Sequence, residues 1–324
     1  MNVITYRPYR GTEELAGMAA ANARLRTRLG LLEPIDLAAM EHRYAHLVNS
    51  DPMTDCLIAE RDGVTVGYAR TEWHDLTDGD RAYDTTAVVE PAAWGLGIAD
   101  ALFAWSEARL RMIARTLPTD RRCWFATYAY DGDEESIPVL EARGYTAVRW
   151  DAEMLRADLL DLPEIVAPGG YTLRTPSEAE LPAVFDMMVV AFAEHWGEYQ
   201  AEDQRLDDWV EDPRFRRDLV VVAWQGDQPV ACVGNVLELR PDGSVRGLLD
   251  SVATHPDHRR RGLARAAIAE SLRRLRDVGA LDAYLGVDTD NHNRALALYE
   301  SCGFRAVTSS TNYRKPFEPG EDRR

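Results

Sequence analysis

The residues with the clearest chemistry lie in one short basic segment of this 324-residue chain, residues 255–264, which reads HPDHRRRGLA. An apolar run at residues 247–253 predicts a strand before it, and the apolar spacing of residues 265–278 predicts a helix after it. A turn between a strand and a helix leaves the first helical N–H groups free and adds the positive end of the helix dipole. Because Gly262 has no side chain, an anion can approach the backbone there, and the segment predicts a phosphate-binding turn.

Three consecutive arginines, Arg259, Arg260 and Arg261, strengthen this prediction. Positive side chains at a helix N-terminus oppose the helix dipole, so they are unfavourable there unless an anion is bound. The alternative is a solvated basic turn without a ligand. A nucleic-acid phosphate is a poor candidate, because the chain as a whole has a net charge of −17.

The length and composition predict a globular protein with two domains. Hydrophobic residues make up 46% of the chain and charged residues 28%, as in ordinary folded domains. The negative charge disfavours nucleic acid and anionic membranes as partners and favours a cationic small molecule or a basic peptide. The alternative is that the acidic surface serves only solubility.

Cysteine usage and hydropathy indicate a cytoplasmic protein. None of the four cysteines has a second cysteine at C-x-x-C spacing, which predicts free thiols in a reducing compartment. The sequence has no apolar run of about 18 residues, so no membrane span is expected. The first ten residues lack the apolar core of a signal peptide.

The basic segment has a second copy earlier in the chain. Residues 91–99 align with residues 256–264 without a gap, so that proline, glycine and alanine coincide, and residues 140–145 match residues 299–304. In both halves a strand, helices, a hairpin and a further strand precede the turn, and a helix, a strand, a helix and a strand follow it. We therefore expect a tandem duplication with two α/β units, at residues 1–158 and 171–324, joined by a Pro- and Gly-rich linker at 159–170.

The second half resembles the GCN5-related N-acetyltransferase (GNAT) superfamily. The family's Arg/Gln-x-x-Gly-x-Gly/Ala signature is matched by residues 259–264, and its Asn…Leu-Tyr-Glu…Gly-Phe signature by residues 291–304. The resemblance implies an α/β fold of the α+β type, with a mixed sheet in each of two tandem acyl-CoA-binding domains, and acetyl-CoA as acyl donor. The two-unit arrangement is similar to that of the mycothiol synthases, although no motif in the chain specifies that activity.

The first half departs from the family pattern. Trp94 stands where the family has Arg or Gln, and Leu140 stands where the second half has Tyr299. Gly95 and Gly97 could still hold a phosphate through the backbone alone. The loss of charge and of the tyrosine nevertheless predicts that the first half is a degenerate, non-catalytic copy.

The resemblance assigns cofactor contacts to the end of the predicted strand, to the turn and to the asparagine before the last helix. These residues are Val252, Ala253, Thr254, Arg259, Arg260, Arg261, Gly262, Leu263, Ala264, Arg265 and Asn291. The turn would hold the CoA pyrophosphate, and the strand end would pair with the pantetheine arm and polarise the thioester carbonyl. Asn291 or Asp290 would also serve as a helix N-cap.

The resemblance also suggests a proton donor. Tyr299 would protonate the departing CoA thiolate, because a thiol of pKa about 8.5 leaves faster when it is protonated and a phenol of pKa about 10 can donate. The alternative is a tyrosine that only packs its ring in the core.

A general base is needed because an amine is mostly protonated at neutral pH. Asp250 lies two residues before Val252, where some family members have a glutamate, and an acid in an apolar strand needs a partner or a purpose. The alternative is a strand-edge acid paired with an arginine. Three further candidates for the base are Glu238, Glu194 and His195.

No metal site is expected. His255 and His258 form an H-x-x-H pair, but no third ligand follows at a suitable spacing. No cysteine or serine with a neighbouring histidine suggests a covalent nucleophile. We therefore expect direct acetyl transfer from acetyl-CoA to a small-molecule amine or a basic peptide in the second half. The alternatives are an acyl-CoA-binding sensor without turnover and a protein N-acetyltransferase.

Overall fold

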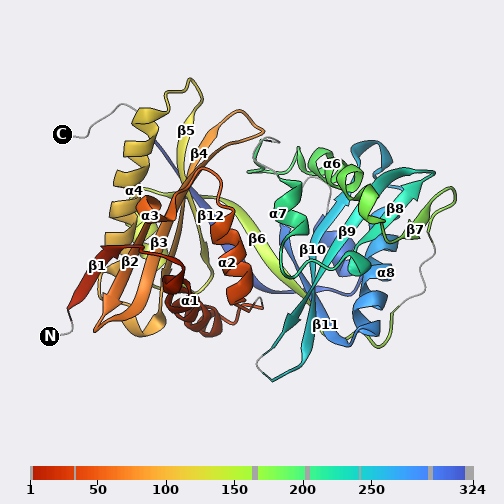
Figure 1. Cartoon of the computed structure of the whole chain (residues 1–324), viewed down its shortest axis with the longest axis horizontal. Helices are drawn as coiled ribbons and strands as arrows, with labels where there is room; N and C mark the ends of the chain where they lie inside the picture. The colour runs from red at the N-terminus through yellow and green to blue at the C-terminus, as the bar shows by residue number, and fades with distance from the viewer. Residues whose placement is uncertain are drawn as a thin grey trace. The chain divides into compact units, whose positions relative to one another are not determined.

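The structure is a computed structural model that describes residues 3–32, 34–162, 167–200, 205–240, 242–290 and 295–317. The chain forms two compact units. Unit 1 is Met1–Trp150 with Thr308–Arg324, and unit 2 is Asp151–Val307. Each unit has a mixed sheet with helices on both faces, which confirms the expected fold class (Figure 1).

Unit 1 contains a sheet with strand order β1-β2-β3-β4-β5-β12. Its elements are β1 (Ile4–Pro8), α1 (Leu15–Leu29), α2 (Leu37–Ala45), α3 (Pro52–Asp55), β2 (Cys56–Arg61), β3 (Val64–Asp75), β4 (Arg81–Val89), α4 (Ile98–Thr116), β5 (Cys123–Tyr130), α5 (Ser136–Ala142), the start of β6 (Thr146–Arg156) and most of β12 (Arg305–Pro316). Leu15 of α1 packs beside Tyr68, and Ile98 of α4 packs beside Ala69. Because successive strand residues point to opposite faces, α1 and α4 cover the two sides of the sheet.

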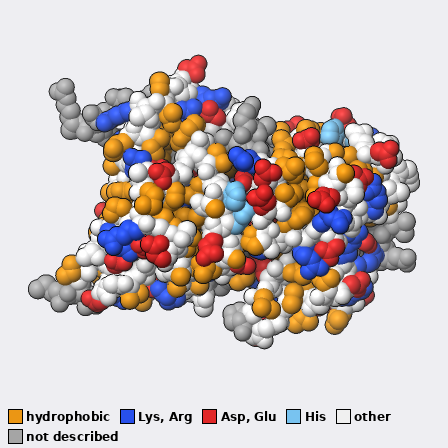
Figure 2. Space-filling view, in the orientation of Figure 1, with side chains coloured by type: hydrophobic (Ala, Val, Ile, Leu, Met, Phe, Trp, Pro, Cys, Tyr) orange, Lys and Arg blue, Asp and Glu red, His pale blue; other side chains and the backbone are white. Residues whose placement is uncertain are grey.

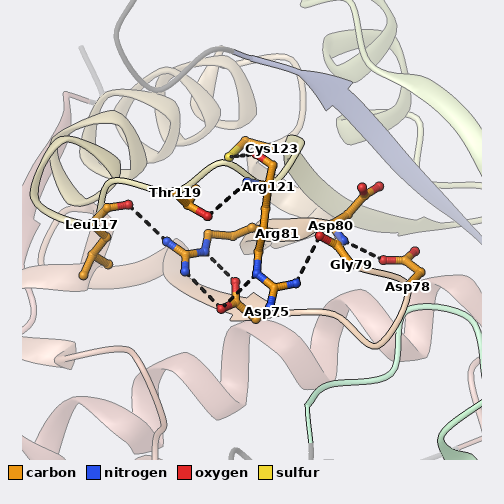
Figure 3. A network of polar contacts seen from close by, with 9 residues as sticks. All are labelled: Asp75, Asp78, Gly79, Asp80, Arg81, Leu117, Thr119, Arg121 and Cys123. Atoms are coloured by element: carbon orange, nitrogen blue, oxygen red, sulfur yellow. Dashed lines mark hydrogen bonds and ion pairs between the residues drawn. The ribbon is translucent and has the colours of Figure 1, made fainter.

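A polar network braces the turn between β3 and β4 (Figure 3). Arg81 donates to both carboxylate oxygens of Asp75, at 2.6 and 3.0 Å, and to the carbonyl oxygen of Leu117 at 3.1 Å. Arg121 lies 3.4 Å from the same carboxylate and donates to the carbonyl oxygen of Gly79. The hydrogen bonds from Arg81 hold the pKa of Asp75 below its usual range. The network therefore fixes where β4 starts relative to β3.

Unit 2 repeats this architecture with strand order β6-β11-β10-β9-β8-β7. Its elements, besides parts of β6 and β12, are β7 (Thr172–Arg174), α6 (Leu181–Phe192), α7 (Leu206–Val210), β8 (Val221–Gln225), β9 (Gln228–Leu239), β10 (Val245–Thr254), α8 (Leu263–Asp277), β11 (Ala280–Asp288) and α9 (Ala295–Ser301). Val184 of α6 packs beside Cys232, and Ile268 of α8 packs beside Val233. Helices α6 and α8 therefore cover opposite faces of this sheet.

The position of α8 determines where the basic turn ends. The helix begins at Leu263, directly after Gly262 in a left-handed conformation, and ends at Asp277, close to the predicted range 265–278. One face is fully buried, with Leu263, Ile268, Leu272 and Leu275 at most 2% exposed. Each such side chain contributes about 1.5–3 kcal/mol on burial, so the core holds the first turn of the helix at the end of β10.

The last strand of each half of the chain lies largely in the unit that the other half builds. Residues 151–156 of β6 pair antiparallel with β11, and residues 310–316 of β12 pair antiparallel with β5. The two compact units are defined by contacts in space, whereas the predicted ranges 1–158 and 171–324 are the two copies of the sequence repeat. The predicted linker at 159–170 lies partly outside the described residues.

Candidate active site

The basic turn of unit 2 connects Thr254, the last residue of β10, to Leu263 of α8. A short 3-10 helix, Pro256–His258, leads into Arg260 and Gly262, whose φ angles are 61° and 81°. A residue with a side chain loses about 1–2 kcal/mol in this left-handed conformation. Backbone strain of this kind is concentrated at binding sites, so the conformation of Arg260 supports a binding role for the turn.

The backbone of the turn is open to an acceptor. The first N–H groups of a helix have no partner within the helix. Among the described residues, no side chain accepts a hydrogen bond from the N–H of Arg260, Gly262 or Ala264. The turn therefore has the free donors and the positive helix end that an anion requires.

Arg259 is committed to protein neighbours. Its guanidinium pairs with the carboxylate of Glu194 at 2.6 Å. It also donates to the carbonyl oxygens of Ala191 and Thr254, at 3.1 and 3.3 Å. These contacts tie the turn to the end of α6, so Arg259 acts first as an anchor.

The other arginines of the turn differ in whether they have hydrogen-bond partners within the protein. Arg261 donates to the hydroxyl of Tyr171 at 2.8 Å, and Arg265 donates to the hydroxyl of Ser301 at 2.6 Å. Arg260 is exposed and has no hydrogen-bond or ionic partner within the described part of the chain. Arg260 is therefore the cation most available to a bound phosphate.

The two histidines of the turn support its shape. Buried His258 lies with its Nδ1 atom 3.2 Å from the hydroxyl of Tyr171, and the Nδ1 atom of His255 accepts from the N–H of Asp257 at 3.3 Å. Burial, followed by the charge of Arg261, lowers the pKa of His258 and favours the neutral ring. Over the described residues, no group of three or more His, Cys, Asp or Glu side chains is placed to hold a metal ion.

Strands β10 and β11 part in the middle of the sheet. Their parallel register runs from Val245 to Leu248, while β10 continues to Thr254 and β11 to Asp288. On its other edge, β10 stays paired with β9 up to Thr254. The edge of β10 at Val252 and Ala253 therefore faces away from β9 with no partner strand among the described elements, and an extended ligand can pair with it as an added strand.

Asp250 lies in a β-bulge just before that edge. Leu249 pairs with Asn235, and Ser251 pairs with the next residue of β9, Gly234, so Asp250 falls outside the register. A bulge inserts one residue and re-aims its side chain. Asp250 is exposed, so its role as the base stays a prediction.

Tyr299 lies in the core of unit 2, in one cluster with residues of β10. It is 7% exposed, in the core cluster that contains Leu249 and Phe304, and Val252 packs against the same cluster. Burial raises the pKa of Tyr299 well above its ordinary value, so the hydroxyl is protonated at neutral pH. The ring thus packs in the core, as the alternative interpretation expects, and the donor role of Tyr299 stays a prediction.

The further candidates for the base are engaged in different ways. Glu238 is buried and accepts a hydrogen bond from the hydroxyl of Tyr284 at 2.7 Å. Glu194 is paired with Arg259, and His195 follows α6 with its ring edge-on to Phe192. Sequence reasoning missed Tyr284, because the registers of β10 with β11 and with β9 together bring it near Glu238.

Asn291 lies outside the described residues, together with residues 292–294. Its contact with the cofactor stays a prediction. Just before it, the N–H of Asp290 donates to the carboxylate of Asp288 at 3.0 Å.

The surface shows no single-sign field on the face drawn in Figure 2, where acidic and basic side chains are interspersed. Within the described residues, no helix is both long enough and apolar enough to cross a membrane.

Comparison with known proteins identifies the family. The model of the acetyltransferase (GNAT) family matches residues 14–145 and again residues 181–304. The chain belongs to the GNAT acetyltransferase family. It is therefore an acetyltransferase with acetyl-CoA as its donor, and it contains the family domain twice.

Two curated relatives match most of the chain, and a third matches a short part of it. A mycothiol acetyltransferase of Geodermatophilus obscurus is 29% identical over 313 residues, covering 93% of this chain and 94% of the relative. A mycothiol acetyltransferase of Streptomyces bingchenggensis is 30% identical over 264 residues, covering 80% of each chain. A ribosomal protein bS18-alanine N-acetyltransferase of Escherichia coli is 36% identical over 74 residues, covering 23% of this chain and 49% of the relative.

Solved structures support the fold along the whole chain. A GCN5-related N-acetyltransferase from Sphaerobacter thermophilus superposes with a TM-score of 0.74 at 19% identity, covering 98% of this chain and 97% of that one. A tandem GNAT protein from the clavulanic acid biosynthesis pathway gives 0.73 at 15% identity, covering 99% of this chain and 100% of that one.

Proposed function

We propose that unit 2 transfers the acetyl group of acetyl-CoA directly to an amine, without an acyl-enzyme. The observation that carries this assignment is the bulge at Asp250, which puts a carboxylate next to the unpaired edge of β10. The matching strand of unit 1, β4, pairs with β3 in one continuous register from Asp75 to Gly67 and has no such residue.

The donor is held by the turn and the strand edge. The open N–H groups of residues 260–264 and the guanidinium of Arg260 bind the pyrophosphate. The edge of β10 at Val252 and Ala253 takes the pantetheine arm as an added strand. A backbone N–H of that edge donates to the thioester oxygen and stabilises negative charge as it develops there.

The protons then move between substrate and side chains. Asp250 accepts a proton from the ammonium form of the acceptor, directly or through water, and the neutral nitrogen attacks the carbonyl carbon. The C–S bond breaks, the attacking nitrogen gives its second proton to water, and the hydroxyl of Tyr299 donates to the thiolate that leaves and is reprotonated from that water. Because burial raises the pKa of Tyr299, we expect it to act mainly as a hydrogen-bond donor to the developing charge.

The acceptor is a small-molecule amine. Relatives that match the chain along most of its length are named mycothiol acetyltransferases, so unacetylated mycothiol is the first acceptor to test. Net negative charge also favours a cationic acceptor over an anionic one. The short match to a ribosomal-protein alanine N-acetyltransferase makes a basic peptide the second acceptor class.

Thiol release from acetyl-CoA tests the proposal with unacetylated mycothiol, simple amines and basic peptides as acceptors. We expect release with the first, about a 10- to 100-fold lower kcat for Tyr299→Phe, and a similar loss for Asp250→Asn. Tyr145→Phe, a buried tyrosine of unit 1, and Asp242→Asn, an exposed acid before β10, are matched controls that keep full activity.

The alternatives give different results in the same assay. Acetyl-CoA binding without thiol release on any amine identifies a sensor. Acetylation of basic peptides but not of small amines identifies a protein N-acetyltransferase. Equal activity of wild type and both active-site variants contradicts the roles of Tyr299 and Asp250.

We place the reaction in the cytoplasm. All four cysteines, Cys56, Cys123, Cys232 and Cys302, are buried free thiols, which supports a reducing compartment. Burial raises the pKa of Cys232 to about 12, so this thiol is not a nucleophile at neutral pH.

A further inference from the structure

Unit 1 contains a second copy of the glycine turn with the same backbone shape. Its residues Gly95 and Gly97 have φ angles of 77° and 74°, against 61° for Arg260 and 81° for Gly262 in unit 2. Both turns follow a 3-10 helix that begins with proline, and both lead directly into a long helix, α4 or α8. The converging N–H groups that bind an anion are therefore built twice.

The turn of unit 1 already holds an anion that belongs to the chain. The N–H of Gly95 donates to one carboxylate oxygen of Glu135 at 2.7 Å, and the N–H of Ala99 donates to the other at 3.5 Å. Glu135 is buried at 9% exposure. Its carboxylate thus lies at the helix N-terminus, where a phosphate would otherwise be bound.

The backbone of Glu135 is itself fixed. One carboxylate oxygen of Asp133 accepts hydrogen bonds from the N–H groups of Glu135 and Ser136, at 3.1 and 2.8 Å. Glu135 directly precedes α5, so it enters the turn from a helix start and not from a loose loop. Glu135 is thus held through its backbone N–H as well as through its carboxylate, and displacing it breaks charge-assisted hydrogen bonds.

Sequence differences between the copies reinforce this occupation. Trp94, Gly95 and Leu96 of unit 1 replace the three arginines of unit 2. Extending the match of residues 140–145 with 299–304 backwards without a gap sets Glu135 opposite Arg294, a residue known here only from the sequence. At the aligned positions, unit 1 therefore has a carboxylate and no arginine where unit 2 has arginines.

We propose that Glu135 is an intramolecular substitute for the pyrophosphate, which closes the CoA cradle of unit 1 and leaves one acetyl-CoA site per chain. The inference goes beyond the proposed function, and it rests on that function only in assigning the remaining site to unit 2. The proposal predicts that the Glu135 side chain alone closes the cradle, because the backbone of the turn has the same conformation in both units.

Hydrogen exchange of the full-length protein with and without CoA tests the closure without any substitution. We expect CoA to slow exchange in peptides that cover residues 256–265 and to leave residues 91–99 unchanged. Slowing in both segments shows that CoA displaces Glu135 and overturns the closure. Slowing in neither, or only in 91–99, contradicts the site proposed in unit 2, and the second outcome contradicts the closure as well.

Equilibrium dialysis with CoA tests the role of Glu135 directly. Wild type is expected to bind one CoA per chain, and Glu135→Ala to bind a second one, at least about 10-fold more weakly because unit 1 lacks the arginines. Glu134→Ala removes an exposed neighbouring carboxylate and is the matched control, with one CoA per chain.

A single CoA on folded Glu135→Ala overturns the proposal, since the closure would then not reside in this side chain. If Glu135→Ala fails to fold, Glu135→Gln removes the charge while keeping an acceptor for the N–H of Gly95. That variant is expected to bind a second CoA more weakly than the alanine variant. Its failure to bind any second CoA while folded contradicts the role of the charge.

Discussion

Units 1 and 2 share the backbone of the glycine turn but differ in what faces it. In unit 2 the N–H groups of the turn are open and Arg260 stands free beside them, whereas in unit 1 the carboxylate of Glu135 accepts from Gly95. A duplicated anion site can thus be closed without a change in its main-chain conformation, because a carboxylate of the same chain occupies it. A glycine signature therefore indicates the conformation of the backbone and not the ligand that it binds.

The strands that lead into the two turns differ as well. Counted from the residues before each turn, the pair Glu72 and Asp84 in unit 1 corresponds to the apolar pair Val236 and Leu248 in unit 2. Between that pair and the turn, only β10 has the extra residue Asp250. Unit 1 thus lacks the proposed base where unit 2 has it.

The strongest test of this comparison substitutes the last glycine of each turn. Gly262→Ala is expected to raise the KM for acetyl-CoA about 100-fold, because a Cβ atom intrudes where charged phosphate oxygens bind and those hydrogen bonds are worth about 1.5–3 kcal/mol. Gly97→Ala is expected to leave KM within about twofold, since no CoA phosphate is bound there. Steady-state kinetics with varied acetyl-CoA measures both.

The two glycines are well matched as controls for each other. Their φ angles are 81° and 74°, and a built Cβ atom meets nothing closer than 3.8 Å at Gly262 and nothing within 4 Å at Gly97. Both substitutions should therefore destabilise the fold by a similar amount, about 1 kcal/mol. Equal effects of the two on KM would break the functional distinction between the turns.

A second test separates two arginines of the same turn. Arg260→Ala is expected to raise the KM for acetyl-CoA about 10-fold, less at high salt, with an unchanged melting temperature, because no described residue depends on this side chain. Arg259→Ala is expected to lower the melting temperature, because it removes the contacts with Glu194 and Ala191. An unchanged KM for Arg260→Ala contradicts its role in phosphate binding.

Local sequence signals predicted the elements around the turn but not the contacts across the sheet. The apolar spacing of residues 265–278 and Gly262 placed α8 to within two residues at its start, because a helix face and a turn glycine are encoded by near neighbours. The bulge at Asp250 depends on the register with β9, and the occupation of Gly95 depends on a side chain 40 residues away. Such long-range pairings leave no periodic trace in the chain.

The smallest expected effect concerns the partly buried acid pair of unit 1, Glu72 and Asp84. Burial, then the neighbouring charge of Glu72, raises the pKa of Asp84 to about 6, although His74, Arg314 and Arg70 act in the opposite direction. A carboxyl whose pKa is raised on folding stabilises the protein fully below its unfolded value of about 3.9 and loses that contribution as pH rises through about 6.

Asp84→Asn removes this titration from unit 1. We expect the variant to be less stable than wild type near pH 4, because its amide has more polar hydrogens to satisfy than the neutral carboxyl, and more stable than wild type above pH 6 by about 1 kcal/mol. Scanning calorimetry at several pH values measures the difference, with Asp120→Asn, an exposed acid of the same unit, as the control. Unit 2 has Leu248 at the corresponding place and therefore no titrating group there. If Asp84→Asn stabilises the protein equally at every pH, the titration of Asp84 is not a difference between the two sheets.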